Sequence, residues 1–144
     1  MKLVAEASII INASPKKVWQ ALTTPSLIKQ YLMDTQVNTT WLEGSAINYR
    51  GIYHGKRYHD RGIIKKIRPN KLLQSTYLSS MSGKEDKSEN YNLITYRLKK
   101  TDDNKTMLTL SQDNNATEQE KKQATQNWKS VLKKLKTVVE SQNK

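Results

Sequence analysis

The sequence predicts an α+β fold in which a curved antiparallel sheet of about seven strands wraps around one long C-terminal helix, with two short helices after the first strand. Three observations predict it. Apolar residues alternate at a period of two through most of the chain, two Ser/Thr-Pro pairs follow the first strand, and an apolar stripe at helical spacing ends the sequence. The length of 144 residues fits a single domain over 1–144.

The first three elements follow from the opening 31 residues. Residues 3–12 place apolar side chains at every second position, which predicts a strand. Ser14-Pro15 supplies an N-cap followed by proline at the first helical position, so a short helix is expected over 15–22. Thr24-Pro25 repeats the device and predicts a second short helix over 25–31.

The middle of the chain, from Asp34 to Gln112, is expected to form about six strands. Turn signals separate them at Glu43-Gly44-Ser45, His54-Gly55-Lys56, Pro69-Asn70 and Asp102-Asp103-Asn104. Alternation predicts these inward sets: Ile47, Tyr49, Gly51 and Tyr53; Ile63, Lys65 and Ile67 or the alternate positions; Leu73, Ser75 and Tyr77; Ile94, Tyr96 and Leu98; Leu108 and Leu110. The spacing favours a meander of hairpins, and the hydrophilic segment 79–89 is expected to be a mobile loop.

The last element is a long amphipathic helix that begins after a capping-box sequence, Thr117-Glu118-Gln119-Glu120, and runs to Glu140. Lys129, Lys133 and Lys136 are expected on its polar side. Its apolar stripe consists of Ala124, Trp128, Val131, Leu132, Leu135, Val138 and Val139. At 1.5 Å per residue the helix would be about 36 Å long, enough to cross a whole sheet.

Composition narrows the class of protein. The chain has no cysteine, which excludes disulfides and thiolate chemistry, and no apolar run approaches the length of a membrane span. Glu6 lies inside the first apolar run and no small-residue cleavage site follows, so a secretory signal is not expected. We therefore expect a soluble, cytoplasmic protein.

The net charge of +12 makes an anionic partner worth testing. The second half of the chain carries most of it, and four basic residues lie close together at one predicted hairpin: Lys65, Lys66, Arg68 and Lys71. They are either a solvated surface or a binding site for an acidic protein. Nucleic acid is not favoured as the partner, because the basic residues alternate with polar residues rather than with stacking aromatics.

Motifs of known catalytic and metal sites are missing from the sequence. There is no Gly-x-Ser-x-Gly elbow, and the five glycines never cluster before a helix as a phosphate-binding loop requires. His54 and His59 are the only histidines, and the cations Lys56, Arg57 and Arg61 beside them would repel a divalent metal. We expect no metal and no cofactor.

Several stretches together resemble the START-like (SRPBCC, Bet v 1-like) superfamily and, within it, bacterial proteins similar to activators of the heat-shock chaperone ATPase. The matching stretches are residues 11–25 (INASPKKVWQALTTP), Trp41-Leu42-Glu43-Gly44, Gly62-Ile63-Ile64 with Pro69 and Leu72, Tyr96-Arg97-Leu98, residues 106–114 (TMLTLSQDN) and residues 128–136 (WKSVLKKLK). Their order and spacing extend the resemblance from about Ile9 to Glu140. It implies the helix-grip architecture, with a cavity between the sheet and the last helix.

The resemblance implies a hydrophobic or amphipathic small molecule in that cavity, lipid-like or polyaromatic. It does not imply a reaction, and we expect binding without catalysis. The chain has seven tyrosines, three tryptophans and no phenylalanine, a bias that suits a pocket with a few fixed polar contacts. The expected ligand-binding residues are Tyr49, Tyr53, Tyr77, Tyr96, Trp128 and Leu132. The same side chains would equally serve as core packing.

Two other functions stay open. One is an interaction module resembling chaperone co-factors, in which the basic residues 65–71 meet a chaperone or another acidic protein. The other is an enzyme that uses a pocket tyrosine as an acid or hydrogen-bond donor. The sequence is compatible with a monomer or a weak dimer.

Overall fold

The computed structural model describes residues 3–102 and 104–142, so Asp103 of the last predicted turn lies outside the described residues. The elements in chain order are β1 (Leu3–Ile11), α1 (Pro15–Thr23), α2 (Pro25–Tyr31), β2 (Gln36–Asn38), β3 (Ala46–Tyr53), β4 (Lys56–Arg68), β5 (Leu72–Tyr77), the 3₁₀ turn η1 (Ser88–Asn90), β6 (Asn92–Lys100), β7 (Thr106–Asn115) and α3 (Glu118–Ser141). The predicted α+β architecture is confirmed.

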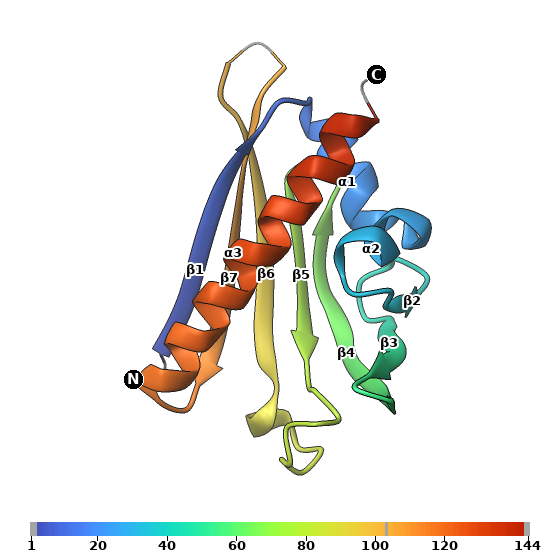
Figure 1. Ribbon diagram of the computed structural model, residues 1–144, viewed down its shortest axis with the longest axis vertical. Helices are drawn as coiled ribbons and strands as arrows, with labels where there is room; N and C mark the ends of the chain where they lie inside the picture. Colours follow the sequence, from blue (N-terminus) through green and yellow to red (C-terminus); the bar gives the residue numbers. More distant parts are fainter. Residues whose placement is uncertain (1–2, 103, 143–144) are drawn as a thin grey trace.

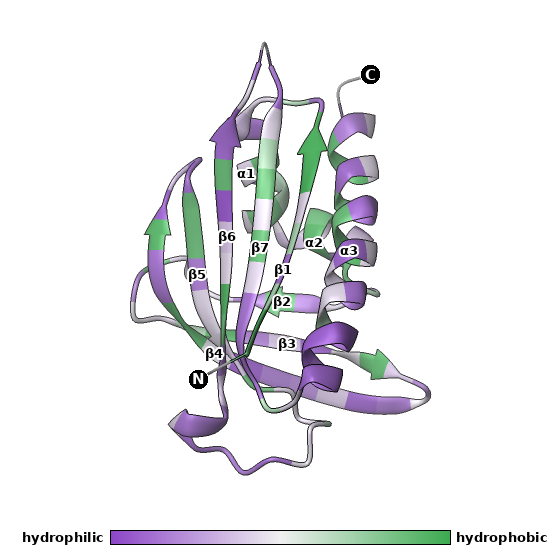
Figure 2. Ribbon diagram, turned by 90° about the vertical axis from the view of Figure 1, so that its left-hand side faces the viewer, coloured by the Kyte–Doolittle hydropathy of each residue, from purple (hydrophilic) through white to green (hydrophobic). Residues whose placement is uncertain are grey.

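All seven strands form one antiparallel sheet in the order β1-β7-β6-β5-β4-β3-β2. Strands β2 to β7 are a meander, and β1 joins its far edge beside β7. The sheet curves strongly, so that the β3–β4 hairpin projects to the side on which α3 lies (Figure 2). This curvature creates a concave face that is partly filled by α3.

Helix α3 crosses the concave face diagonally, from the end of β7 to the two short helices, and leaves the lower parts of β4 and β5 uncovered (Figure 1). Its predicted apolar stripe faces the sheet: Ala124, Leu132, Leu135, Val138 and Val139 are buried, and Trp128 and Val131 are partly buried. The Thr117 hydroxyl accepts the Glu120 N–H at 3.0 Å, as the capping box requires. The Glu120 carboxylate accepts the N–H of Ala116 rather than that of Thr117.

One lysine of the predicted polar side has a specific contact. Lys136 donates to the backbone carbonyl of Ile10 at 2.8 Å and is paired with Glu140, whose carboxylate also accepts the N–H of Asn12. Strand β1 lies at the edge of the sheet. Lys136 and Glu140 therefore hydrogen-bond a carbonyl and an N–H, of Ile10 and Asn12, that could otherwise pair with another strand. The prediction that Lys136 lies away from the sheet with Lys129 and Lys133 is therefore wrong.

The short helices begin as predicted and close one end of the concave face. The Ser14 hydroxyl accepts the N–H of Lys17 at 3.4 Å, whereas Thr24 caps α2 with its carbonyl and makes no side-chain cap. Tyr31 at the end of α2 is 2% exposed and donates its hydroxyl to the carbonyl of Ala21. This buried hydrogen bond ties α2 to α1.

Strand β4 contains an irregularity that simple alternation does not predict. Ile64 is fully buried and Ile63 is 42% exposed, and a register shift between Ile64 and Lys66 then turns Ile67 inward. The predicted inward set of Ile63, Lys65 and Ile67 is therefore wrong before the register shift, and the alternate set is wrong after it. Gly62 is required just before this point, because a Cβ there would lie 1.7 Å from the carbonyl oxygen of Thr76 on β5.

Candidate functional site

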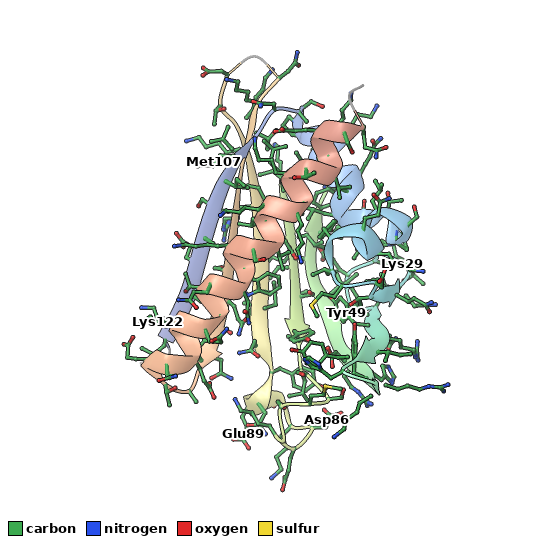
Figure 3. The ribbon with its side chains drawn as sticks, in the orientation of Figure 1. Lys29, Tyr49, Asp86, Glu89, Met107 and Lys122 are labelled. Carbon is green, nitrogen blue, oxygen red and sulfur yellow. The ribbon has the colours of Figure 1, made fainter. Side chains whose placement is uncertain are left out.

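The candidate site lies on the part of the concave face that α3 leaves open. Figure 3 shows Tyr49 of β3 in this region, with Asp86 and Glu89 in the loop below it. Tyr49, Tyr77 and Tyr96 lie on β3, β5 and β6, each two residues from a buried residue, and therefore on the concave face of the sheet. Helix α3 contributes Trp128. All four side chains pack against the core and remain partly exposed.

The four aromatic rings form two edge-to-face pairs. Tyr49 and Tyr77 have ring centroids 5.5 Å apart, and Tyr96 and Trp128 have centroids 6.5 Å apart. The indole N–H of Trp128 donates to the side-chain oxygen of Gln112 at 2.7 Å. These contacts fix the ring orientations, which a ligand site needs if it is to be largely pre-formed.

A buried carboxylate stands beside the tyrosines. Asp60 on β4 is directly opposite Tyr49 in the sheet and is 7% exposed. Tyr77 donates its hydroxyl to one carboxylate oxygen at 2.5 Å, and Ser80 donates its backbone N–H at 2.8 Å and its hydroxyl at 3.1 Å to the other. Asp60 thus joins β4, β5 and the start of the long loop after β5.

Sequence reasoning missed this role of Asp60. The signal was available in the alternation of β4, because the alternate inward set that includes Ile64 also includes Asp60 and Gly62. Sequence alone does not decide between the two sets, since Ile63 and Ile64 are equally apolar.

Burial and the nearby carboxylate hold the tyrosine hydroxyls in their neutral form. Burial raises the pKa of Tyr49 to about 12, opposed by a hydrogen bond with Ser75 and assisted by the charge of Asp60. Burial also raises the pKa of Tyr77, and the charge and hydrogen bond of Asp60 raise it further. The pKa values of Tyr31 and Tyr96 are raised by burial first and then by neighbouring tyrosines. These tyrosines therefore act as hydrogen-bond donors at neutral pH.

Two predicted ligand-binding residues lie differently. Tyr53 is 43% exposed at the end of the β3–β4 hairpin and contacts His54 edge-to-face, with centroids 4.1 Å apart. Leu132 of α3 is 1% exposed and lies within the core. Neither side chain takes part in the two edge-to-face ring pairs. A ligand-binding role for Tyr53 and Leu132 remains a prediction.

Two shallow surface hollows lie elsewhere. One is at the β6–β7 turn, lined by Lys100, Thr101, Asp102 and Lys105, and the other runs along the N-terminal half of α3, between Glu118 and Lys129. Neither lies between the sheet and α3. The enclosed cavity that the resemblance implies remains a prediction.

The histidines are separated by the hairpin turn. His54 and Gly55 form that turn with positive φ angles, and the His59 ring nitrogen is 2.7 Å from the side-chain oxygen of Asn48. Within residues 3–102 and 104–142, no group of three or more His, Asp or Glu side chains is arranged to hold a metal ion.

The predicted basic residues lie on the outer side of the protein. Lys65, Lys66, Arg68 and Lys71 are all exposed. The register places Arg68 opposite Leu72 and Leu72 opposite Arg97, so that Arg97 of β6 extends the same row. In the described part of the chain none of these five side chains forms an ion pair. We call these five residues the basic row.

The sheet order, the two short helices after β1 and the long helix on the concave face define a helix-grip domain of the START-like superfamily. The chain belongs to the family described as "Activator of Hsp90 ATPase homolog 1-like protein", whose profile matches residues 12–140. Among the described residues, no helix is long and apolar enough to cross a membrane.

Solved structures agree with this assignment. A Cytophaga hutchinsonii protein determined in solution is 38% identical, with a TM-score of 0.84 over 97% of this chain and 95% of its own. The Aha1 dimer from Colwellia psychrerythraea is 23% identical, with a TM-score of 0.73 over 95% and 96% of the two chains. CalU16 from Micromonospora echinospora is 17% identical, with a TM-score of 0.73 over 96% and 85%. The last two show likeness of fold alone, and no curated protein matches the sequence.

Proposed function

We propose that this protein binds a hydrophobic or amphipathic small molecule, lipid-like or polyaromatic, between the sheet and α3, in the cytoplasm and without catalysis or a cofactor. One observation carries the proposal: Tyr49, Tyr77, Tyr96 and Trp128 turn toward the core and yet remain partly exposed on the concave face. Partly exposed aromatic rings on a concave face offer apolar surface that a ligand can cover.

The test is a two-dimensional amide NMR spectrum of labelled protein, recorded with and without a panel of lipids and polyaromatic compounds. A ligand on the concave face should shift the indole N–H of Trp128 and the amides of β3, β5 and β6. Ser8 and Thr109, which face each other on β1 and β7 with exposed hydroxyls, serve as internal controls and should not shift. If no compound perturbs Trp128 or the tyrosine strands, the proposal is wrong.

A second function, binding of an acidic protein such as a chaperone, is supported by the basic row. Exposed cations without ion pairs are available to a partner, and attraction between exposed charges is screened over about 8 Å at physiological ionic strength. Binding should therefore weaken steeply as salt rises. The family description names an activator of Hsp90 ATPase, which makes an Hsp90-type chaperone the first partner to test.

Charge reversal tests this second function. The double variant Lys65→Glu/Lys66→Glu should lose binding to the chaperone, while Lys129→Glu/Lys133→Glu, with the same charge change on exposed positions of α3, should keep it. Equal binding by both double variants would exclude the basic row as the interface. Lys65 and Lys66 lie on the other side of the sheet from the concave face, and Lys129 and Lys133 are exposed on α3, so small-molecule binding should be the same in both.

A further inference from the structure

The polar groups of the concave face restrict the kind of molecule that it accepts, an inference that rests on the proposed small-molecule binding. Three groups matter: the Asp60 carboxylate, the hydroxyl of Tyr49 and the hydroxyl of Tyr96. The hydrogen bonds that these groups already make, or lack, show which donors and acceptors remain for a ligand.

The Asp60 carboxylate is not available to a ligand. Both of its oxygens already accept hydrogen bonds, one from Tyr77 and the other from the N–H and hydroxyl of Ser80, and the residue is 7% exposed. A ligand ammonium group therefore has no free carboxylate oxygen with which to form a contact ion pair.

Tyr49 and Tyr96 each keep a proton to donate. The Ser75 hydroxyl lies close enough to that of Tyr49 to act on its pKa, and since either hydroxyl can be the donor, the Tyr49 proton can be given to a ligand while Ser75 donates to the phenol oxygen. Within the described residues the Tyr96 hydroxyl has no hydrogen-bond partner. No side-chain polar atom without a partner is fully buried there, so this hydroxyl is accessible to a ligand or to solvent. Raised pKa values keep both hydroxyls protonated.

The charges at the site are of one sign. Asp60 is the charged side chain that acts on Tyr49 and Tyr77, and in the described part of the chain no lysine or arginine acts on Tyr31, Tyr49, Tyr77 or Tyr96. The cations of the basic row lie on the opposite side of the sheet. A ligand carboxylate or phosphate beside these hydroxyls would be repelled by Asp60, and no lysine or arginine among the described residues acts on them to offset the loss of its hydration.

We infer that the concave face binds an uncharged aromatic molecule whose polar end is a hydrogen-bond-accepting oxygen, such as a ketone carbonyl, held by the hydroxyls of Tyr49 and Tyr96, and that Asp60 excludes anions. The rings of Tyr49, Tyr77, Tyr96 and Trp128 supply the surface for the aromatic skeleton. Fatty acids and phospholipid headgroups are excluded as ligands.

A matched series of four naphthalenes tests the inference: 2-acetylnaphthalene, 2-ethylnaphthalene, 2-naphthoate and 2-(aminomethyl)naphthalene. They share one skeleton and differ in the polar end, which is respectively a neutral acceptor, no polar group, an anion and a cation. Affinities are measured by NMR titration of the Trp128 indole N–H, identified by its loss in Trp128→Phe. The ketone should bind about fivefold more tightly than the ethyl compound, the gain of one hydrogen bond, and at least about tenfold more tightly than the naphthoate.

Two conservative variants assign the effect to the hydroxyls. Tyr96→Phe and Tyr49→Phe keep the ring, so each should reduce ketone affinity toward that of the ethyl compound and leave the ethyl compound unaffected. Tyr53→Phe, at the exposed hairpin end, is the control and should change neither. Asp60→Asn, where it folds, should bind the naphthoate more tightly than the wild type does.

The outcomes separate the two ideas. Equal affinity for the ketone and the ethyl compound, or tightest binding of the naphthoate or the ammonium, would overturn this inference and leave small-molecule binding standing. Failure of all four to bind would count against both.

Discussion

The pKa values of four tyrosines predict how the protein behaves at alkaline pH. Tyr31, Tyr49, Tyr77 and Tyr96 all have pKa values raised above 10 by burial, so the folded protein holds their protons at a pH where the unfolded chain has released them. A group whose pKa is higher in the folded state loses its favourable contribution as pH rises above its unfolded value. The stability of this protein should therefore fall above pH 10.

The magnitude follows from linkage. For Tyr49, with a pKa of about 12 in the folded state, the free energy of unfolding falls by about 1.4 kcal/mol per pH unit between pH 10 and 12. With all four tyrosines protonated when folded, the slope approaches about 5 kcal/mol per unit. Since domains of this size have about 5–15 kcal/mol of stability, unfolding is expected between about pH 11 and 13.

The assay follows tyrosinate absorbance at 295 nm and circular dichroism at 222 nm in one alkaline titration. Four of the seven tyrosines should ionise only as the circular dichroism is lost. Tyr49→Phe should reduce the pH dependence of the unfolding free energy by one proton, and Tyr53→Phe, at an exposed site, should leave it as in the wild type. Smooth ionisation of all seven tyrosines in a protein with native circular dichroism would refute the reasoning.

Three further predictions concern stability. Leu135→Ala, at a fully buried position of α3, should cost about 2–5 kcal/mol in chemical denaturation, and a loss below 1 would mean that α3 packs loosely. Gly62→Ala should lower the melting temperature by calorimetry, because its Cβ would meet the Thr76 carbonyl; an unchanged value would contradict the close approach of β4 and β5. Burial desolvates Glu140, but its bonds to Lys136 and the Asn12 N–H lower its pKa overall. Glu140→Gln should therefore destabilise the protein by about 1 kcal/mol at pH 7 and by less at an acidic pH below the lowered pKa, where the wild-type carboxylate is protonated. An equal loss at both pH values would contradict this.

The long helix and the short helices could be predicted from the sequence because their signals are local. A capping hydroxyl, a proline at the first helical position and a stripe at helical spacing act within one or two turns, and all three elements begin as expected. The same holds for the alternation of β5 and β6, which turns Tyr77 and Tyr96 inward. The aromatic residues of the site could thus be predicted from the pattern within each strand separately.

The inner face of β4 could not be predicted in the same way. Ile63 and Ile64 are chemically equivalent, and only the register shift opposite β5 decides that Ile64 is buried and that Ile67 follows it. That choice also turns Asp60 inward, where its partners come from residues 17 to 20 positions away. The acidic part of the site therefore escaped sequence reasoning.

Lys136 shows the same division. As one of several lysines on α3 it matches the polar side of the helix, and its role appears only when α3 lies across the edge of the sheet and brings Ile10, 126 residues away, to its ammonium group. The sequence by itself determined the elements, their order and the aromatic character of the concave face, because these depend on spacing within each segment. The tertiary structure decided the register, the burial of Asp60 and the hydrogen-bond partners of its carboxylate, because each of these depends on contacts between segments far apart in the chain.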